Sequence, residues 1–444
     1  MILAPVFAPV RVQAEAPRDI GDYIVSEAAA LIDGDTGQVL FNKNMHKKMG
    51  PASITKIMTA LVALENSGLD DVITISHDAV FSIGRGTSHI ALDVGEEILM
   101  EHALYALAIA SANDAANGIA EHVGGTMQGF TALMNERAAK AGAYNTNFIN
   151  AHGLSDSNHY TTAYDMAMIA MAAIKTPHFC KMFGTVKYEM PPTNKQSEKR
   201  IFNSRNAMLA GNYKYDGFIA GKTGWTSDTG HTLVTAAKKG GRTLIAVVMM
   251  SSASRDKWED STALLNYGFR EFAEARFTPE DFPVFYLPIK DAEGNDSDVI
   301  ISSGEEFKRL VPKPYTKDDV EIRYELANGG AADELIIKTV FTLRVPATLA
   351  FMADLGEMAM SLSLSGSLIG AGGLEPAAPE ETQTNDSPQK GGTALRIILT
   401  VFIIFVSLIL GALVILSIRR IIIIRKRRQT RKIDYYIGER KMVK

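Results

Sequence analysis

Three short motifs in this chain carry the residue types that an activated serine needs. The first places Ser53 three residues before Lys56, at the start of a segment whose apolar residues recur at helical spacing. Residues three apart on a helix share a face, so Lys56 is expected to reach the Ser53 hydroxyl. A lysine that is desolvated, or that lies near a second cation, loses its proton more easily. It can then act as the base for a serine that is otherwise a weak nucleophile.

The spacing Ser-x-x-Lys is a weak signal by itself. Composition predicts about two chance matches in a chain of this length, and two more occur, Ser254 with Lys257 and Ser387 with Lys390. A plain alternative for Ser53 is a serine at a helix start beside a solvated lysine. The choice between the two interpretations depends on whether partner motifs exist.

The second motif is Ser111-Ala112-Asn113, which interrupts a helical stretch predicted over residues 100–123. Its hydroxyl could relay a proton, and its amide could hold a peptide group of a substrate. Ser204-Arg205-Asn206 has the same pattern. The alternative for Ser111 is a helix break with local capping.

The third motif, Lys222-Thr223-Gly224, closes a predicted strand and is expected only about 0.1 times by chance. Lys222 supplies a fixed cation, and Thr223 offers a hydroxyl to a carboxylate. Gly224 leaves room for a substrate strand to pass close to the backbone. The N–H of Trp225 is expected to join that of Ser53 in an oxyanion hole. A surface turn is the alternative.

These motifs lie in a predicted first domain, residues 17–275. A hairpin is predicted over 28–42, a short strand over 71–75, and strands over 218–223, 232–237 and 243–250, the last two joined at Gly240-Gly241. Helices are predicted over 100–123, 127–141, 162–174 and 258–274. An antiparallel sheet covered by helices fits this alternation. Short strand-like segments over 277–350 predict a small all-β domain.

The two ends of the chain predict export and anchoring. Residues 1–16 resemble the tail of a signal peptide and end in the small-x-small sequence Ala14-Glu15-Ala16. Residues 363–393 read as a flexible linker. The uncharged residues 397–418 would form a helix about 33 Å long, enough to span a bilayer. The basic residues 419–444 then mark a cytoplasmic tail, which leaves the body of the protein outside a single-pass membrane anchor.

Composition excludes some classes of function. Hydrophobic residues make up 46% of the chain and charged residues 22%, as in folded proteins with a sizeable core. The net charge is −4, and the body of the chain shows no nucleic-acid footprint. Cys180 is the single cysteine, so no intrachain disulfide is possible, and we interpret it as a small core residue.

Taken together and in order, the three motifs resemble those of the low-molecular-mass penicillin-binding proteins, the serine D-alanyl-D-alanine carboxypeptidases of peptidase family S11. Residues 147–160 and 221–230 also resemble that family around its site. The likeness is strong over about residues 25–275 and covers 277–350 in outline. It implies an α+β fold of the penicillin-binding-protein/β-lactamase type, followed by a β-rich domain. To this the composition adds the C-terminal transmembrane helix.

The resemblance implies the following roles. Ser53 attacks the D-Ala-D-Ala carbonyl of a peptidoglycan stem peptide after Lys56 takes its proton, Ser111 and Lys222 protonate the leaving D-Ala, and water hydrolyses the acyl-enzyme. Asn113 and Trp225 contact the substrate, and Thr223 holds its carboxylate with a cation that could be Arg255 or Lys257. β-Lactams should acylate Ser53, and neither a metal nor a cofactor is needed. The bulk of Trp225 bears on the substrate fit.

Three alternatives remain at this stage. A class A β-lactamase has the same motifs, but Glu189 and Glu198 do not stand in that enzyme's Glu-x-x-Leu-Asn pattern. A DD-endopeptidase that cuts peptidoglycan cross-links is compatible with the motifs. The third is a non-catalytic receptor for muropeptides or β-lactams, against which the intact Ser53, Lys56 and Lys222 argue.

Overall fold

A computed structural model of the chain describes residues 20–84, 86–283, 285–290, 296–301, 305–328, 335–345 and 354–362. Contacts divide the chain into two units, Met1–Gly373 and Leu374–Lys444, and the second unit contains no described residue. The predicted signal peptide, linker, membrane span and basic tail all lie outside the described residues. Among the helices that are described, none is long and apolar enough to cross a bilayer.

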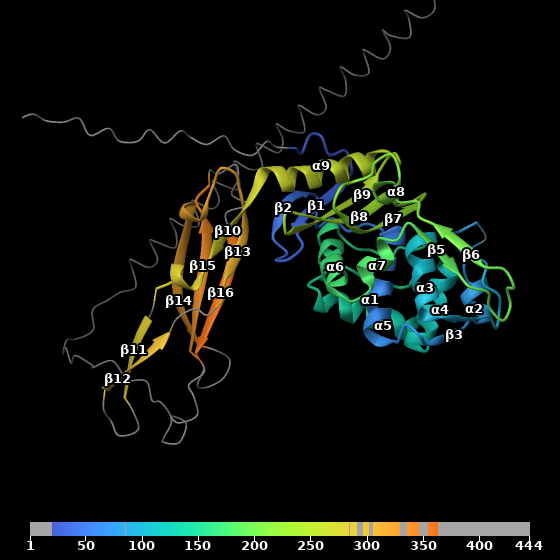
Figure 1. Ribbon diagram of the computed structural model, residues 1–444, viewed down its shortest axis with the longest axis horizontal. Coiled ribbons are helices and arrows are strands. Elements are labelled where there is room, and N and C mark those ends of the chain that lie inside the picture. The colour runs from blue at the N-terminus through green and yellow to red at the C-terminus, as the bar shows by residue number, and fades with distance from the viewer. Residues whose placement is uncertain are drawn as a thin grey trace, which may run out of the picture. The chain divides into compact units, whose positions relative to one another are not determined.

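A five-stranded antiparallel sheet in the order β2-β1-β9-β8-β7 forms the centre of the first domain (Figure 1). Its strands are β1 (Ala28–Asp33), β2 (Val39–Lys43), β7 (Phe218–Thr226), β8 (Gly230–Lys239) and β9 (Arg242–Ser251). Both predicted hairpins are formed, β1 with β2 and β8 with β9. The N-terminal hairpin pairs with β9 from much later in the sequence, and β7 is an edge strand.

Helices cover both faces of this sheet, because successive side chains of a strand point to opposite faces. In β1, Ala28, Ala30 and Ile32 pack against the larger helical layer, and Ala29 and Leu31 pack against the helix on the other face. The larger layer contains α1 (Lys56–Asn66), α4 (Asn113–Gly124), α5 (Met127–Lys140) and α6 (Ala163–Lys175), and α9 (Asp256–Glu271) covers the opposite face (Figure 1). The predicted sheet covered by helices is therefore confirmed.

The remaining elements of the first domain are short. They are η1 (Ala52–Thr55), β3 (Val72–Thr74), α2 (His77–Phe81), β4 (Glu97–Leu99), α3 (Met100–Tyr105), the π-helical turn η2 (Ala106–Ala110), α7 (Phe179–Phe183), β5 (Lys187–Met190), β6 (Arg200–Asn203) and α8 (Ala207–Ala210). The helix predicted over 100–123 is thus broken around Ser111, as expected. The helix predicted over 258–274 is wrong at its end, since Phe272 begins a strand. In that strand Phe272, Ala275 and Phe277 are buried and the other residues are not.

The β-rich segment contains three small antiparallel sheets. Their strands are β10 (Phe272–Phe277) with β13 (Phe307–Pro312), β11 (Phe285–Lys290) with β12 (Asp296–Ile301), and β14 (Val320–Asn328), β15 (Leu335–Leu343) and β16 (Asp354–Leu362), with the short turns η3 (Pro279–Asp281) and η4 (Lys317–Asp319) between them. Stacked Phe307 and Phe341, 3.6 Å between ring centroids, are part of its core. β16 lies beyond the predicted boundary at residue 350.

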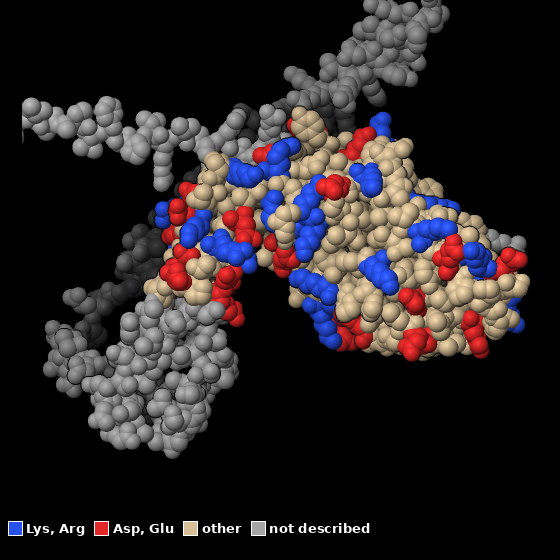
Figure 2. All heavy atoms as spheres, in the orientation of Figure 1, with Lys and Arg blue, Asp and Glu red and all other residues tan. Residues whose placement is uncertain are grey.

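Two features tie the sheet to its surroundings. Asp260 of α9 is buried and accepts hydrogen bonds from the backbone N–H groups of Val25 and Ser26 and from the Ser26 hydroxyl, which fixes the helix beside β1. Gln38 donates to the carbonyl of Leu310 at 2.7 Å and accepts from its N–H at 2.8 Å, which joins the N-terminal hairpin to β13. On the face shown in Figure 2, acidic and basic side chains are interspersed.

Candidate active site

Ser53 and Lys56 lie where η1 runs into α1. Ser53 is half-buried and Lys56 is fully buried. As the spacing predicts, the Lys56 Nζ lies 3.1 Å from the Ser53 Oγ. The preceding residue, Ala52, has a positive φ of 50°. Strained backbone of this kind occurs where surrounding contacts hold it in place, often at functional sites.

Two further contacts fix the direction of the Lys56 lone pair. The Nζ lies 2.7 Å from the Asn113 Oδ1 and 2.6 Å from the His152 carbonyl oxygen, and neither oxygen can donate a hydrogen bond. A neutral amine has two N–H donors and one lone pair. Both donors are taken by these oxygens, so the lone pair points to the one partner that can donate, the Ser53 hydroxyl. The arrangement is that of a base aimed at its nucleophile.

Burial supplies the neutral amine that this geometry needs. The pKa of Lys56 is lowered well below its usual value, first because burial penalises the ammonium and then because the Lys222 cation is nearby. Lys222 is also buried, and desolvation lowers its pKa to about 7. The two amines therefore lie in one low-dielectric cleft, in which burial favours the neutral form of Lys56.

The break in the long helix places Ser111 between the two lysines. Ser111 follows the π-helical turn η2 in a left-handed conformation, φ 59°, which ends one helix and lets α4 begin at Asn113. Its Oγ accepts a hydrogen bond from the Lys222 Nζ at 3.0 Å. The next helical turn carries Asn113, which contacts Lys56. A single irregular turn thus links both amines.

The end of β7 forms the other wall. A Cβ added at Gly224 would lie 2.8 Å from the Ser53 backbone nitrogen and 2.4 Å from the Thr232 Oγ1. Glycine is therefore required for β7 to approach the nucleophile this closely. Trp225, the next residue, is 60% exposed at the rim of the cleft. Because β7 is an edge strand, an extended peptide can be added beside it.

The loop before α6 holds the nucleophile turn from behind. Gly153, φ 89°, packs so closely on the Ala52 carbonyl that an added Cβ would lie 1.9 Å from that oxygen.

The same loop carries buried, neutral histidines. The Ile149 N–H donates to the His159 Nδ1, so the Nε2 of the neutral ring carries the hydrogen and donates to the Thr55 Oγ1 at 2.9 Å. Burial lowers the pKa of His159 to about 4, and that of His152 to about 3.

The three motifs line one cavity of about 440 Å³. Its lining residues include Ser53, Ser111, Lys222, Thr223, Gly224, Trp225, Arg205, His231, Ser254 and Lys257. Of the two candidate cations, Lys257 is 5% exposed and lines the cavity, whereas the Arg255 side chain is 70% exposed and lies 3.5 Å from Glu259. Desolvation lowers the pKa of Lys257 to about 8.

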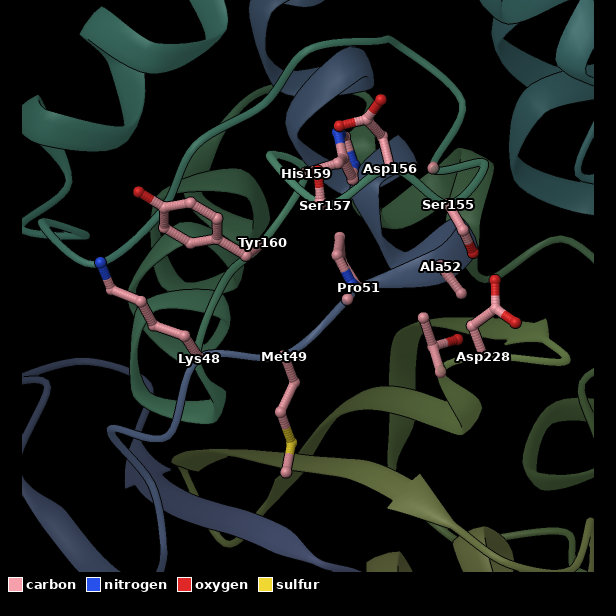
Figure 3. A pocket seen from close by; sticks show the side chains of 13 residues that line it. Lys48, Met49, Pro51, Ala52, Ser155, Asp156, Ser157, His159, Tyr160 and Asp228 are labelled. Atoms are coloured by element: carbon pink, nitrogen blue, oxygen red, sulfur yellow. The ribbon is translucent and has the colours of Figure 1, made fainter.

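A second cavity, of about 620 Å³, lies beside the residues that precede Ser53 and has no lining residue in common with the first (Figure 3). Pro51 and Ala52 line it together with His159 and Tyr160, and none of the motif side chains does. In the part of the chain that the structure describes, no cluster of three or more His, Cys, Asp or Glu side chains is placed to hold a metal ion.

The structure thus brings together all eight residues singled out from the sequence: Ser53, Lys56, Ser111, Asn113, Lys222, Thr223, Gly224 and Trp225. It adds the His152 carbonyl and His231, which the motifs did not indicate. A main-chain oxygen has no sequence signature, and His231 is near Lys257 only because β8 and α9 pack together. Of the other pattern matches, Ser254 with Lys257, and Ser204 with Asn206, also reach this cavity.

Comparison with known proteins agrees with this geometry. Residues 12–253, more than half of the chain, match the Peptidase S11 family model, described as D-alanyl-D-alanine carboxypeptidase. The D-alanyl-D-alanine carboxypeptidase DacF of Bacillus subtilis is 33% identical over 313 residues, which cover 69% of this chain and 78% of that protein. DacC of Escherichia coli is 31% identical over 328 residues, covering 70% and 77%.

Solved structures give the same result. A mutant of the Streptomyces K15 DD-transpeptidase has a TM-score of 0.53 at 30% identity and covers 55% of this chain and 98% of its own. The D-alanyl-D-alanine carboxypeptidase DacD of Francisella tularensis has a TM-score of 0.59 and covers 82% of this chain and 96% of its own. Its identity of 23% supports the fold alone.

Gly224 gives a direct test of the site's geometry. We expect Gly224→Ala to lower the rate of covalent labelling of Ser53 by fluorescent penicillin by about 100-fold, because the added methyl group would displace β7 from the nucleophile. Gly84→Ala is the matched control, since its Cβ would meet no atom closer than 3.7 Å. Equal labelling of the two variants, both folded by circular dichroism, would contradict the close approach.

Proposed function

The chain belongs to the serine D-alanyl-D-alanine carboxypeptidase family, and we propose that Ser53 is the nucleophile on which its reaction takes place. The reaction is removal of the terminal D-alanine from a stem peptide ending in D-Ala-D-Ala. One observation carries this assignment. Two carbonyl oxygens direct the lone pair of a buried, neutral Lys56 at the Ser53 hydroxyl. This geometry activates the serine and adds little to the stability of the fold.

Acylation follows from this geometry. The Ser53 Oγ attacks the carbonyl carbon between the two D-alanines while its proton passes to the Lys56 Nζ. The backbone N–H groups of Ser53 and Trp225 stabilise the oxyanion of the tetrahedral intermediate. Gly224 supports this role, since it lets β7 lie against the Ser53 N–H. The Asn113 Oδ1 accepts from Lys56, which leaves its amide Nδ2 to hold the peptide group of the substrate.

The leaving group departs through the second amine. The C–N bond breaks, and the D-alanine nitrogen receives a proton from the Ser111 hydroxyl, which is replaced from Lys222 at 3.0 Å. Thr223 and Lys257 hold the carboxylate of that D-alanine. We assign this role to Lys257 rather than Arg255 because Lys257 is buried in the cavity wall and Arg255 is directed to solvent.

Water completes the cycle. It attacks the ester on Ser53 once the proton that Lys56 took in acylation has passed to the deprotonated Lys222, so that Lys56 is again a base. Lys56 takes a proton from the water and returns it to the Ser53 Oγ as the shortened peptide leaves. A β-lactam presents a strained amide beside a carboxylate, so it should acylate Ser53 by the same route. Because the amide is part of a ring, the amine stays attached to the acyl group when the C–N bond breaks. The acyl-enzyme then persists. The peptidoglycan stem peptide is the proposed natural partner and the β-lactam an inhibitor.

Ser53→Ala tests the nucleophile. We expect D-alanine release from a free pentapeptide ending in D-Ala-D-Ala to fall by at least about 10⁴-fold, with penicillin labelling lost, because no other group can form the ester. Ser197→Ala, an exposed serine outside the cavity, serves as control. Retained turnover in Ser53→Ala would refute the assignment. If the wild type cleaved cross-linked dimers but not free pentapeptide, the result would instead favour the DD-endopeptidase.

The pKa of Lys257 predicts the alkaline limb of the pH profile. The carboxylate needs the ammonium form, so kcat/KM of the wild type should fall above about pH 8. Lys257→Arg keeps its charge at high pH. Loss of the Lys222 proton, whose pKa is about 7, affects both enzymes alike, so we expect kcat/KM of Lys257→Arg, lower overall, to decline less than that of the wild type between pH 8 and pH 9.5 on the same peptide. An identical decline in both enzymes would show that another group sets this limb.

We also propose that residues 397–418 anchor the enzyme in the cell membrane with its catalytic domain outside the cytoplasm. Support comes from composition: 22 uncharged residues precede the basic tail. The full chain is expected in the membrane fraction after an alkaline wash, and a chain ending at residue 393 in the soluble fraction. Finding both in the same fraction would contradict the anchor. External protease should digest the body but spare the tail.

A further inference from the structure

Lys257 is a buried cation held by neutral groups. Its Nζ donates to the Ser254 Oγ at 2.8 Å, lies 3.4 Å from the His231 Nδ1, and lies 4.5 Å from the centre of the Trp258 ring. Among the described residues, no carboxylate is within ion-pair distance of it. A buried ammonium without an acidic partner is poised for an anion that arrives from outside.

His231 comes from the sheet rather than from the helix that carries Lys257. It lies on β8, where it pairs with Trp225 of β7 on one side and Ser251 of β9 on the other. Its ring is 6.0 Å from that of Trp225. His231 therefore lies between the strand that forms the cleft wall and the first turn of α9. The side chains of Trp225, His231 and Lys257 all line the catalytic cavity.

The number of donors on the ammonium decides what these contacts can do. A lysine ammonium has three N–H donors and no acceptor. The Ser254 oxygen accepts one and the His231 Nδ1 can accept a second, which leaves the third for a ligand. To accept, the imidazole must be neutral with its hydrogen on Nε2. Burial, and then the Lys257 cation, lower the pKa of His231, which favours the neutral ring, and the nearby ammonium favours the tautomer whose Nδ1 can accept.

We propose that His231 is a positioning residue for substrate specificity: its Nδ1 holds the Lys257 ammonium so that the remaining N–H meets the C-terminal carboxylate of the substrate. This inference rests on the proposed function, and it deepens that function by assigning the preference for a free carboxylate to a histidine outside the three motifs. His231 does not touch the reacting atoms. It acts through Lys257, on binding of the leaving D-alanine.

The proposal predicts that two substrates depend differently on His231. A peptide ending in a free D-alanine carboxylate should depend on His231, whereas the same peptide ending in a carboxamide should not. Without the imidazole, the long lysine side chain regains rotamer freedom and its ammonium is no longer fixed toward the cavity. The loss should appear in KM and not in kcat, because the contact exists before the bond is broken.

The test compares His231→Leu, which removes the acceptor, with His231→Gln, which keeps one. For the acid peptide we expect His231→Leu to raise KM about tenfold with kcat changed less than threefold, and His231→Gln to recover most of the loss. For the amide peptide, kcat/KM should match that of the wild type in both variants. His77→Leu replaces an exposed histidine of α2 and is the control. Thermal melting confirms that each variant is folded.

Two outcomes would overturn the proposal. One is an unchanged KM for the acid peptide in folded His231→Leu. The other is an equal loss on the acid and amide peptides, which would indicate a general distortion of the cleft. Penicillin labelling distinguishes failure of the His231 proposal from failure of the proposed function. If the wild type released no D-alanine, slower acylation of His231→Leu by benzylpenicillin, which carries a carboxylate, would still support the role of His231, and equal acylation would refute it.

Discussion

The structure depends on the burial of two amines in one cleft. Water would keep Lys56 protonated, and a protonated lysine cannot take a proton from Ser53. Removing the amine from water, with Lys222 close by, lowers the pKa of Lys56 and so favours its neutral form. The carbonyl oxygens of Asn113 and His152 then complete the design, because they fix two hydrogens and so orient the lone pair.

This burial requires a scaffold that tolerates its cost. A buried amine and the positive φ angles at Ala52 and Ser111 are both unfavourable in isolation. The two-faced sheet and its helical layers offset them through a large apolar core. Gly153 behind the nucleophile turn and Gly224 in front of it let two backbone segments approach at distances that a side chain would prevent. The catalytic geometry is thus held by packing on both sides of one turn.

The side chains that line the cavity change in chemical character along the edge strand β7. At one point β7 meets Ser53 and the proposed proton-transfer groups, and further on Trp225 and His231 lie beside the Lys257 cation. In the proposed mechanism, a substrate strand added to β7 has its scissile bond at the first point and its terminal carboxylate at the second. The same spacing suits a β-lactam, which presents an amide and a carboxylate in one small molecule.

The sequence by itself determined the family and most of the elements. The three motifs, the hairpins, the break at Ser111 and the helices could be predicted because they depend on spacing along a few residues. It could not say which cation faces the cavity, or that His231 and the His152 carbonyl contact the lysines. These contacts join residues far apart in the chain, and only packing decides them. Burial, on which every amine pKa here depends, is likewise a property of the folded structure and not of any local pattern.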